Sequence, residues 1–496
     1  MNILLPVAAR LGVEYEHPEH RRMNKVWRAV RDCLLKRVKE QGLVYLPHPT
    51  PEYLKSSDPK IRQAAERRYV SYNKRAVHVP MCRRTRSGLI GQVNQRPPLV
   101  KLPEQLELYK RQMSIRGYSL YSLATLVVGE LTSMGRCALV ADFSATMERP
   151  FVEIVAAEDI ITWAGFDGKK VTAATPLRMI MYRQAYDRLS ADMTVVEQHT
   201  RLVHMAMIND VAHVRVRTLE NMWGEWLPVL VNGAKVDRLP AIVLGAEVND
   251  VDVETPPMAE LAEIEIAHYR NSADYEEMVH VAGQATPVFT GLTEDWYNNV
   301  LKGTVRFGTY GGIPLPKDAD AKFLQIVPNG VAAEAIKQKE AMARAVGAQL
   351  IEERQIRRTA AEVGIEAAAN HSTLSLAAHN TEEGLNYALR FSAMFVGAPE
   401  DSVSFKFNAD YSGGASSVEA RRTVVEEYLK GAISWTELRD SLRQGNPHVT
   451  MDDDAVKKEI EDAQEAKRVA LMEQSSYNPD GSPKQPKPEG DPNAKT

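Results

Sequence analysis

The hydrophobic positions along the chain follow two different periods, which separate helical stretches from strand-rich ones. Within residues 18–41, helical spacing separates Val26, Val30, Cys33, Leu34 and Val38. This spacing predicts an amphipathic helix, and Gly42 is a suitable residue to end it. Similar patterns predict helices near 58–77 and at 103–134. The first quarter of the chain is therefore expected to be mainly helical.

Residues from 137 to about 250 are dominated by strand patterns. Strands are predicted at 137–143, 150–156, 177–185, 200–208 and 212–219. Asn232-Gly233 follows the apolar run WLPVLV, and this dipeptide is a strong signal for a tight β-hairpin. Turn residues separate several of these segments, so an antiparallel arrangement is expected.

The second half of the chain returns to helical periodicity. Helices are predicted at 258–282, 331–350, 360–396 and within 416–473, with short strands in 285–328. Residues 474–496 contain five prolines and no hydrophobic periodicity, so this tail is expected to be disordered. Together these elements predict an α+β fold.

A run of charged residues interrupts the apolar pattern between the helices predicted at 331–350 and 360–396. Its five charged side chains are Glu352, Glu353, Arg354, Arg357 and Arg358. Thr359 and Glu362 match a capping box, which predicts a helix start near 360 and an exposed loop before it. The helix propensity of Glu, Arg and Gln favours one continuous helix instead. We predict the break.

Charge is distributed unevenly, although the net formal charge of the whole chain is only −4. Residues 1–116 contain 24 Lys and Arg against 10 Asp and Glu, so the remaining chain is acidic. Within 66–88, Tyr69 and Tyr72 lie among basic residues, a pattern typical of nucleic-acid contact. A solvated helix followed by a loop explains the same pattern. The basic third is expected either to meet an anionic partner or to neutralise acidic surfaces of neighbouring subunits.

The familiar local signatures of enzymes are missing from the sequence. It contains no phosphate-binding loop, no nucleotide-binding glycine motif, no zinc-protease motif and no nucleophile elbow. In the helix predicted at 258–282, Glu276 and His280 lie one turn apart but lack a third metal ligand. His268 falls on the apolar face of that helix, where a neutral histidine with one hydrogen bond is expected. We predict no catalytic residues, no metal and no cofactor.

The three cysteines, Cys33, Cys82 and Cys137, are odd in number and far apart in the sequence. Their spacing argues against a disulfide framework and against a zinc site. The longest apolar stretch, 123–143, contains Glu130 and Arg136, so no transmembrane helix is expected. The first residues lack a basic start followed by a long apolar run, so no signal peptide is predicted.

Six segments of the chain occur in an order that is typical of one protein family. They are RPFVEIVAAEDIITW (149–163), GQATPVFTGL (283–292), VPNG (327–330), GAQLIEERQIRRTAAE (347–362), NHSTLSLAAHNTEEGLNYAL (370–389) and GAISWTELRDSL (431–442). In this order, over about 20–470, the chain resembles tailed-bacteriophage portal proteins, including a family described only as phage protein of unknown function. The resemblance implies an α+β subunit with a helical and β-rich wing, stem helices, a β-rich clip and a C-terminal helical segment.

The resemblance also implies a division of the chain into parts. These are a wing part at 1–164, a β-rich region with the clip at 165–255, a stem helix at 256–284, a second wing part at 285–415 that includes a tunnel loop near 348–359 and a long helix at 360–396, a helical upper wing or crown at 416–473, and a disordered tail at 474–496. The tunnel-loop side chains expected to face DNA are Glu352, Glu353, Arg354, Arg357 and Arg358.

Portal proteins are non-enzymatic rings, usually of twelve subunits, at one vertex of a capsid. The partners implied by the resemblance are other copies of the chain, double-stranded DNA in the channel, the terminase large subunit, the head–tail adaptor and the major capsid protein. The implied location is the virion, after assembly in the host cytoplasm and without a membrane. Two alternatives remain open: another virion structural protein, such as a head–tail adaptor or minor capsid protein, or a soluble enzyme with a nonlocal active site.

Overall fold

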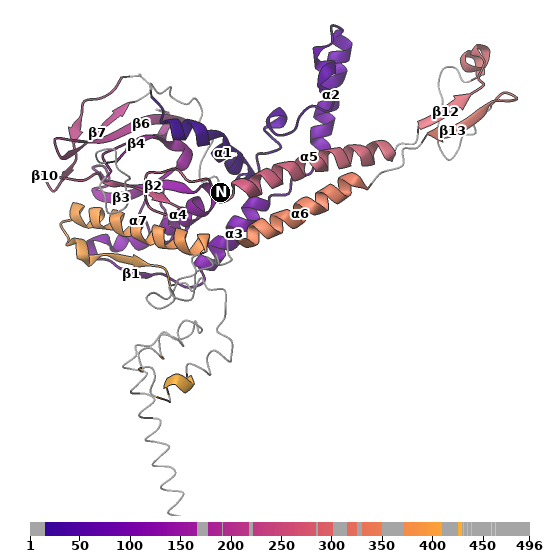
Figure 1. Ribbon diagram of the computed structural model, residues 1–496. Coiled ribbons are helices and arrows are strands. Elements are labelled where there is room, and N and C mark those ends of the chain that lie inside the picture. The colour runs from indigo at the N-terminus through magenta and orange to yellow at the C-terminus, as the bar shows by residue number, and fades with distance from the viewer. Residues whose placement is uncertain are drawn as a thin grey trace, which may run out of the picture. The chain divides into compact units, whose positions relative to one another are not determined.

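A computed structural model gives the arrangement of the chain (Figure 1). It describes residues 15–165, 177–190, 192–217, 222–283, 286–300, 315–324, 330–349 and 372–408, and beyond these 425–428, 430, 434, 438, 458 and 462. Met1–Tyr411 form one compact unit, and Ser412–Thr496 form a second. The described part of the first unit is a mixed α+β fold with several small antiparallel sheets, as the sequence pattern predicts.

The first part of the chain forms α1 (Pro18–Leu34), α2 (Pro59–Arg75), α3 (Met81–Val93) and α4 (Leu120–Met134). Helix α1 ends earlier than predicted because Lys36 takes a left-handed conformation, with φ at 60°. The single helix predicted at 103–134 is wrong. Gly117 has a φ of 84°, and the hydroxyl of Ser119 then accepts from the backbone N–H of Ser122 to start α4.

A three-stranded antiparallel sheet forms the centre of the unit (Figure 1). Its strands, in spatial order, are β11 (Ala241–Gly245), β2 (Arg136–Ser144) and β3 (Arg149–Ala156). Successive side chains of a strand point to opposite faces. Leu139 and Ala141 therefore join a cluster with the helices, whereas Ala138 and Val140 join a cluster with a second sheet. Both faces are apolar because both are covered.

The second sheet has five antiparallel strands in sequence order. They are β4 (Ile160–Ala164), β5 (Met179–Leu189), β6 (Val196–Ile208), β7 (Val211–Arg217) and β8 (Leu227–Pro228). The predicted Asn-Gly hairpin is confirmed: β9 (Leu230–Val231) pairs with β10 (Ala234–Lys235) across Asn232 and Gly233, whose φ angles are 50° and 80°.

Helix α7 (Thr373–Phe395) packs against β11 and β2, and short strands β1 (Leu99–Lys101) and β14 (Ser404–Lys406) pair beside it. The uninterrupted helix predicted at 360–396 is not observed. Ser372 has extended backbone angles, and its hydroxyl accepts from the N–H of Ser375, so α7 has its own start there. Thr359 and Glu362 lie outside the described residues, so the capping box stays a prediction.

The remaining elements of the first unit are α5 (Ala259–Ala282), β12 (Thr286–Thr290), a π-helical turn at Trp296–Val300, β13 (Asp320–Leu324) and α6 (Val331–Gln349). In the second unit, 425–428 are helical, and most of the helices predicted within 416–473 lie outside the described residues. The tail at 474–496 lies outside them as well. None of the described helices is long and apolar enough to span a membrane.

Candidate functional site

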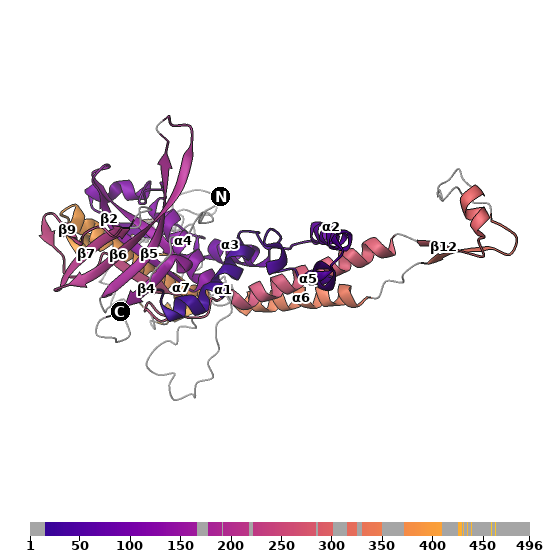
Figure 2. The same cartoon turned by 90° about the horizontal axis from the view of Figure 1, so that it is seen from above.

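Helices α5 and α6 lie side by side as an antiparallel pair in both views (Figures 1 and 2). At 1.5 Å per residue, the 24 residues of α5 span about 36 Å. Strands β12 and β13 pair with each other and are the link in the chain between the two helices. By connectivity, this small β-hairpin follows the end of α5 that is remote from the central sheet.

Burial changes along α5. Its first half packs into the main core, where Leu261 and Ile264 are buried among α1, α3 and the central sheet. Its second half is mostly half-buried and becomes exposed toward the end, where the side chain of Val279 is 45% accessible. On α6, Val331 is 68% accessible. The helical pair is therefore anchored at one end and presents much of its length to the surroundings.

Helix α2 contacts the middle of α5 through hydrogen bonds and an ion pair. The Tyr72 hydroxyl donates to the Asp274 carboxylate at 2.6 Å, and the Tyr269 hydroxyl donates to Asn73 at 2.5 Å. The Arg75 guanidinium pairs with the Glu277 carboxylate in the same interface. Since these bonds connect residues about 200 positions apart, α2 holds the direction in which α5 leaves the core.

His268 lies on the buried face of α5, as predicted, and faces α6. The expected single hydrogen bond is not observed: within the described residues neither ring nitrogen has a partner at hydrogen-bond distance, and the nearest carboxylate oxygen, on Glu340, lies 3.7 Å away. Burial lowers the pKa of His268, and Glu340 offsets only part of this effect. A neutral imidazole in the core is the result.

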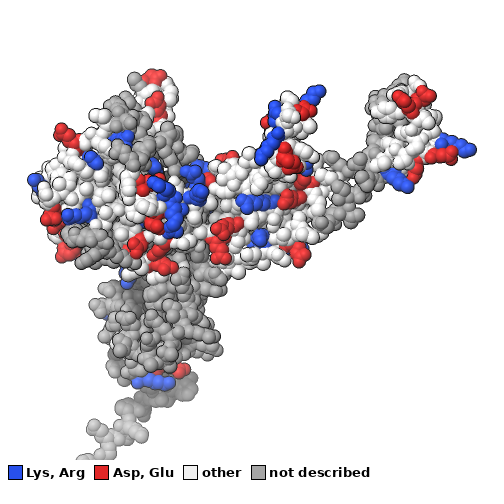
Figure 3. All heavy atoms as spheres, turned by 45° about the horizontal axis from the view of Figure 1, so that its top comes forward, with Lys and Arg blue, Asp and Glu red and all other residues white. Residues whose placement is uncertain are grey.

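The helical pair carries more acidic than basic side chains. The acidic ones are Glu260, Glu263, Glu265, Asp274, Glu276, Glu277, Glu334 and Glu340, and the basic ones are Arg270, Lys337, Lys339 and Arg344. Figure 3 shows both signs interspersed over the two helices. Apart from Glu265, which is buried, these side chains form a surface that binds the phosphate backbone of DNA weakly, because phosphate binding needs an excess of Lys and Arg.

The β12–β13 hairpin exposes apolar side chains. Val288 on β12 is accessible, and Tyr297 and Val300 are accessible on the π-helical turn that follows. An isolated two-stranded hairpin is marginally stable at best. These exposed apolar groups are therefore suited to contact a partner.

The charged segment singled out in the sequence cannot be placed. Glu352, Glu353, Arg354, Arg357 and Arg358 all lie outside the described residues, which stop at 349 and resume at 372. Their assignment to a DNA-facing loop stays a prediction.

The basic stretch at 66–88 differs from the expected basic and aromatic surface. Arg67 and Arg68 are exposed on α2, but the aromatic rings turn inward. The Tyr69 hydroxyl donates to the carbonyl of Leu46, and Tyr72 is buried against α5. Aromatic rings that stack on bases need an exposed face. Buried Tyr72 therefore offers no face for base stacking, whereas contact between the basic residues and nucleic acid stays a prediction.

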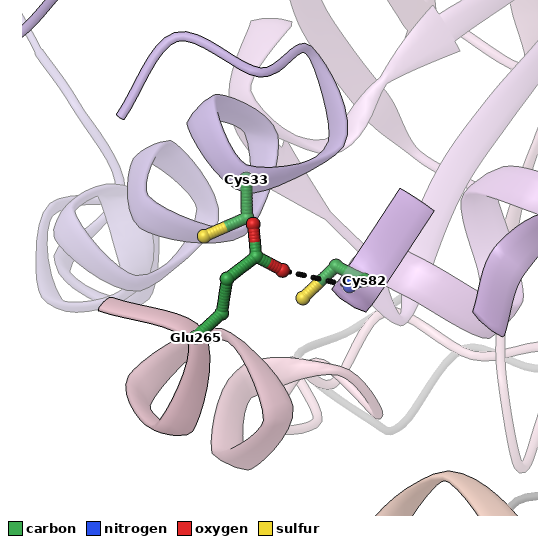
Figure 4. A group of neighbouring side chains, drawn as sticks. All are labelled: Cys33, Cys82 and Glu265. Carbon is green, nitrogen blue, oxygen red and sulfur yellow. Dashed lines mark hydrogen bonds between the residues drawn. The ribbon is translucent and has the colours of Figure 1, made fainter. Parts of the chain in front are cut away.

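Three helices meet at a buried group that the sequence argument missed (Figure 4). Cys33 at the end of α1, Cys82 at the start of α3 and Glu265 on α5 place one ligand atom each within 4.8 Å of the others. The wide spacing of the cysteines argued against a zinc site, and that expectation stays a prediction; the spacing did not indicate that Cys33 and Cys82 lie close together. No local motif signals the group, because the three residues come together only through helix packing.

Residues 257–396 match the family model of a domain of unknown function (DUF4055), which covers α5, β12–β13, α6 and α7. No curated protein matches the chain. Among solved structures, a chain of the virion of the native gene transfer agent particle matches with a TM-score of 0.38 and 16% identity, covering 75% of this chain and 92% of that one. A chain from the neck of the empty particle matches with a TM-score of 0.41 and 15% identity, covering 74% and 90%.

Proposed function

We propose that the chain is a portal subunit: a ring-forming structural protein that conducts double-stranded DNA through one vertex of a capsid. The observation that carries the proposal is the α5–α6 pair, anchored in a mixed α+β core at one end and joined by the β12–β13 hairpin at the other. Helix α5 corresponds to the stem helix that the resemblance implied at 256–284, whereas the clip is proposed to lie in the β12–β13 hairpin rather than within 165–255. The subunit is proposed to be non-enzymatic, since packaging is driven by the terminase.

Ring formation accounts for the exposed apolar groups of the helical pair. Val279, Val281, Val331 and Met342 are all accessible in the single chain. A helix with apolar side chains outside its own core normally buries them against another element. In a cyclic assembly each subunit offers the same two faces to its neighbours, so α5 and α6 of adjacent copies would cover these groups.

The charge of the helical pair suits a channel for moving DNA. Strong phosphate binding along the wall would slow sliding, and an acidic excess avoids it. We propose that the tunnel loop near 348–359 supplies the few positive contacts. Arg354, Arg357 and Arg358 would make weak, exchangeable bonds to phosphates, with Glu352 and Glu353 limiting their strength.

The docking element is proposed to be the β12–β13 hairpin rather than the strand-rich region 165–255. Strands β5 to β7 pack on the central sheet through a shared apolar cluster, which leaves them part of the body. The hairpin, in contrast, exposes Tyr297 and Val300. The terminase large subunit, and after it the head–tail adaptor, would bind there, whereas the body would face the major capsid protein.

The oligomeric state of the full-length protein tests the proposal. Mass photometry and negative-stain electron microscopy should find a closed ring of about twelve copies with a central channel. A species that stays monomeric at every concentration and salt, together with capsids that package DNA normally in its absence, would overturn it. A ring found away from the capsid vertex would favour another virion protein.

A further inference from the structure

Cys33, Cys82 and Glu265 form a compact group at the junction of α1, α3 and α5 (Figure 4). All three residues are buried, and Glu265 is only 1% accessible. Its carboxylate receives the N–H of Cys82 on one oxygen at 2.7 Å, and the other oxygen lies 2.7 Å from Nε2 of His78. Two thiols and an imidazole thus surround one buried carboxylate.

Core packing alone does not account for this combination. A buried free cysteine usually behaves as a small hydrophobic residue, in apolar surroundings. Here two sulfur atoms from helices far apart in sequence lie against a carboxylate, which is costly to bury. The pKa of the Cys82 thiol is raised by its hydrogen bond with Cys33, by burial and by the negative charge of Glu265. A cation would reverse that repulsion by stabilising the thiolate.

We propose that this group is a structural site for a thiophilic divalent cation, with Zn²⁺ as the ion that it fits best. Thiolate sulfur, imidazole nitrogen and carboxylate oxygen are the ligands of protein zinc sites. In a tetrahedral site, Zn–S bonds of about 2.3 Å separate two sulfur atoms by about 3.8 Å. The three ligand atoms of this group lie within 4.8 Å of one another, so about 1 Å or less separates the two sulfur atoms from that spacing.

Cys33 Sγ, Cys82 Sγ and one oxygen of Glu265 are three of the ligands. His78 lies outside this group of three, and its Nε2 would move from Glu265 to the metal to supply the fourth ligand. Binding releases one proton from each thiol to solvent, so two thiolates and the carboxylate offset the charge of the ion. The ion would tie the start of α5 to α1 and α3, where the helical pair is anchored. This inference does not depend on the proposed function.

Metal analysis and cobalt substitution on the full chain test the site. After purification in a reducing buffer without a metal-affinity tag, elemental analysis should find about one zinc per chain. Replacing zinc with Co²⁺ should give the sulfur-to-cobalt charge-transfer band and the visible bands of a tetrahedral ion. This readout needs no variant, so it holds even if a substitution prevents folding.

Variants assign the ligands. Cys33→Ser and Cys82→Ser should reduce bound zinc to background, whereas Cys137→Ser, a buried cysteine on β2, should leave it unchanged. His78→Gln should also reduce the bound zinc, because it removes the fourth ligand. Equal zinc content in all cysteine variants, or the absence of a tetrahedral cobalt spectrum in the wild-type protein, would overturn the proposal. A Cys33–Cys82 disulfide that persists in the reducing buffer, with one free thiol left in the denatured chain, would also overturn it.

Discussion

The Arg31 guanidinium makes two parallel hydrogen bonds to the Glu130 carboxylate, from Nη1 to Oε1 at 2.9 Å and from Nη2 to Oε2 at 2.6 Å. It also bonds the Glu158 carboxylate from Nε at 2.7 Å, so it links α1, α4 and the turn before β4. Burial alone would raise the pKa of Glu130, but the charge and hydrogen bonds of Arg31 hold it below its usual value.

We expect loss of either partner to be costly. Glu130→Gln or Arg31→Ala should lower the free energy of unfolding by about 3–5 kcal/mol, because a buried charge is left without compensation. Replacing both by apolar residues, as in Arg31→Met with Glu130→Leu, should recover only part of this loss, because Glu158 and Arg86 each lose a partner. Because the folded pKa of Glu130 is lowered, its contribution is present at neutral pH and disappears as the pH falls below about 4.5.

Urea unfolding of the full chain measures these changes. The exposed pair Arg22 and Glu19 on α1 is the matched control, and Arg22→Ala should cost only about 0–1 kcal/mol. Equal losses for the buried and the exposed pair would contradict the interpretation.

Gly384 marks a close approach between α7 and the central sheet. A Cβ atom there would lie 2.5 Å from the side chain of Leu244, which is fully buried. Gly384→Ala should therefore destabilise the protein by about 1–3 kcal/mol. Gly88→Ala on α3, with no atom within 4 Å of the new Cβ, should instead stabilise by about 0.5–1 kcal/mol. Thermal unfolding of both variants checks the opposite signs.

His204 on β6 is expected to make the stability of the protein fall at acidic pH. Burial and the neighbouring Arg215 lower the pKa of His204 to about 4. The unfolded chain takes up a proton near the ordinary value of 6.5, so stability should fall as the pH drops from about 6.5 to about 4. His204→Gln should flatten this part of the curve of urea midpoint against pH. An unchanged slope would show that other groups cause it.

The tunnel loop is tested by charge removal. Replacing Arg354, Arg357 and Arg358 together by Ala should leave ring assembly intact and lower the DNA retained per capsid, because the exchangeable phosphate contacts are lost. Electron microscopy measures the ring, and quantitative DNA extraction from capsids measures retention. The triple replacement of the exposed Arg67, Arg83 and Arg84 is the control and should retain normal DNA levels. Equal DNA loss in both would refute the assignment of the loop.

The β12–β13 hairpin is tested by replacement. Exchanging 286–324 for a short glycine and serine linker should abolish binding of the terminase large subunit without changing the unfolding midpoint of the body. The body should keep its stability because its core residues lie outside this segment. The single change Asp210→Asn in the β6–β7 turn is the control, since this turn belongs to the five-stranded sheet. Normal terminase binding without the hairpin would place the docking surface elsewhere.

Hydrophobic periodicity predicted the bounds of an element correctly where that element buries an apolar face. The strand β2 and the helix α5 lie close to their predicted ranges, and the Asn232-Gly233 turn forms as expected because its backbone angles suit those two residues. Hydrophobic periodicity did not predict the end of a helix where the backbone angle of one residue stops it. Lys36 and Gly117 both take left-handed angles and break helices that the apolar pattern alone would continue.

The sequence by itself determined the α+β class and the helices predicted at 258–282 and 331–350, because hydrophobic periodicity is a local property. Only the tertiary structure decided what Cys33 and Cys82 do. They lie 49 positions apart, and Glu265 lies far beyond both, so no local pattern connects them. Helices α1, α3 and α5 pack around one apolar core, and that packing brings the three side chains together.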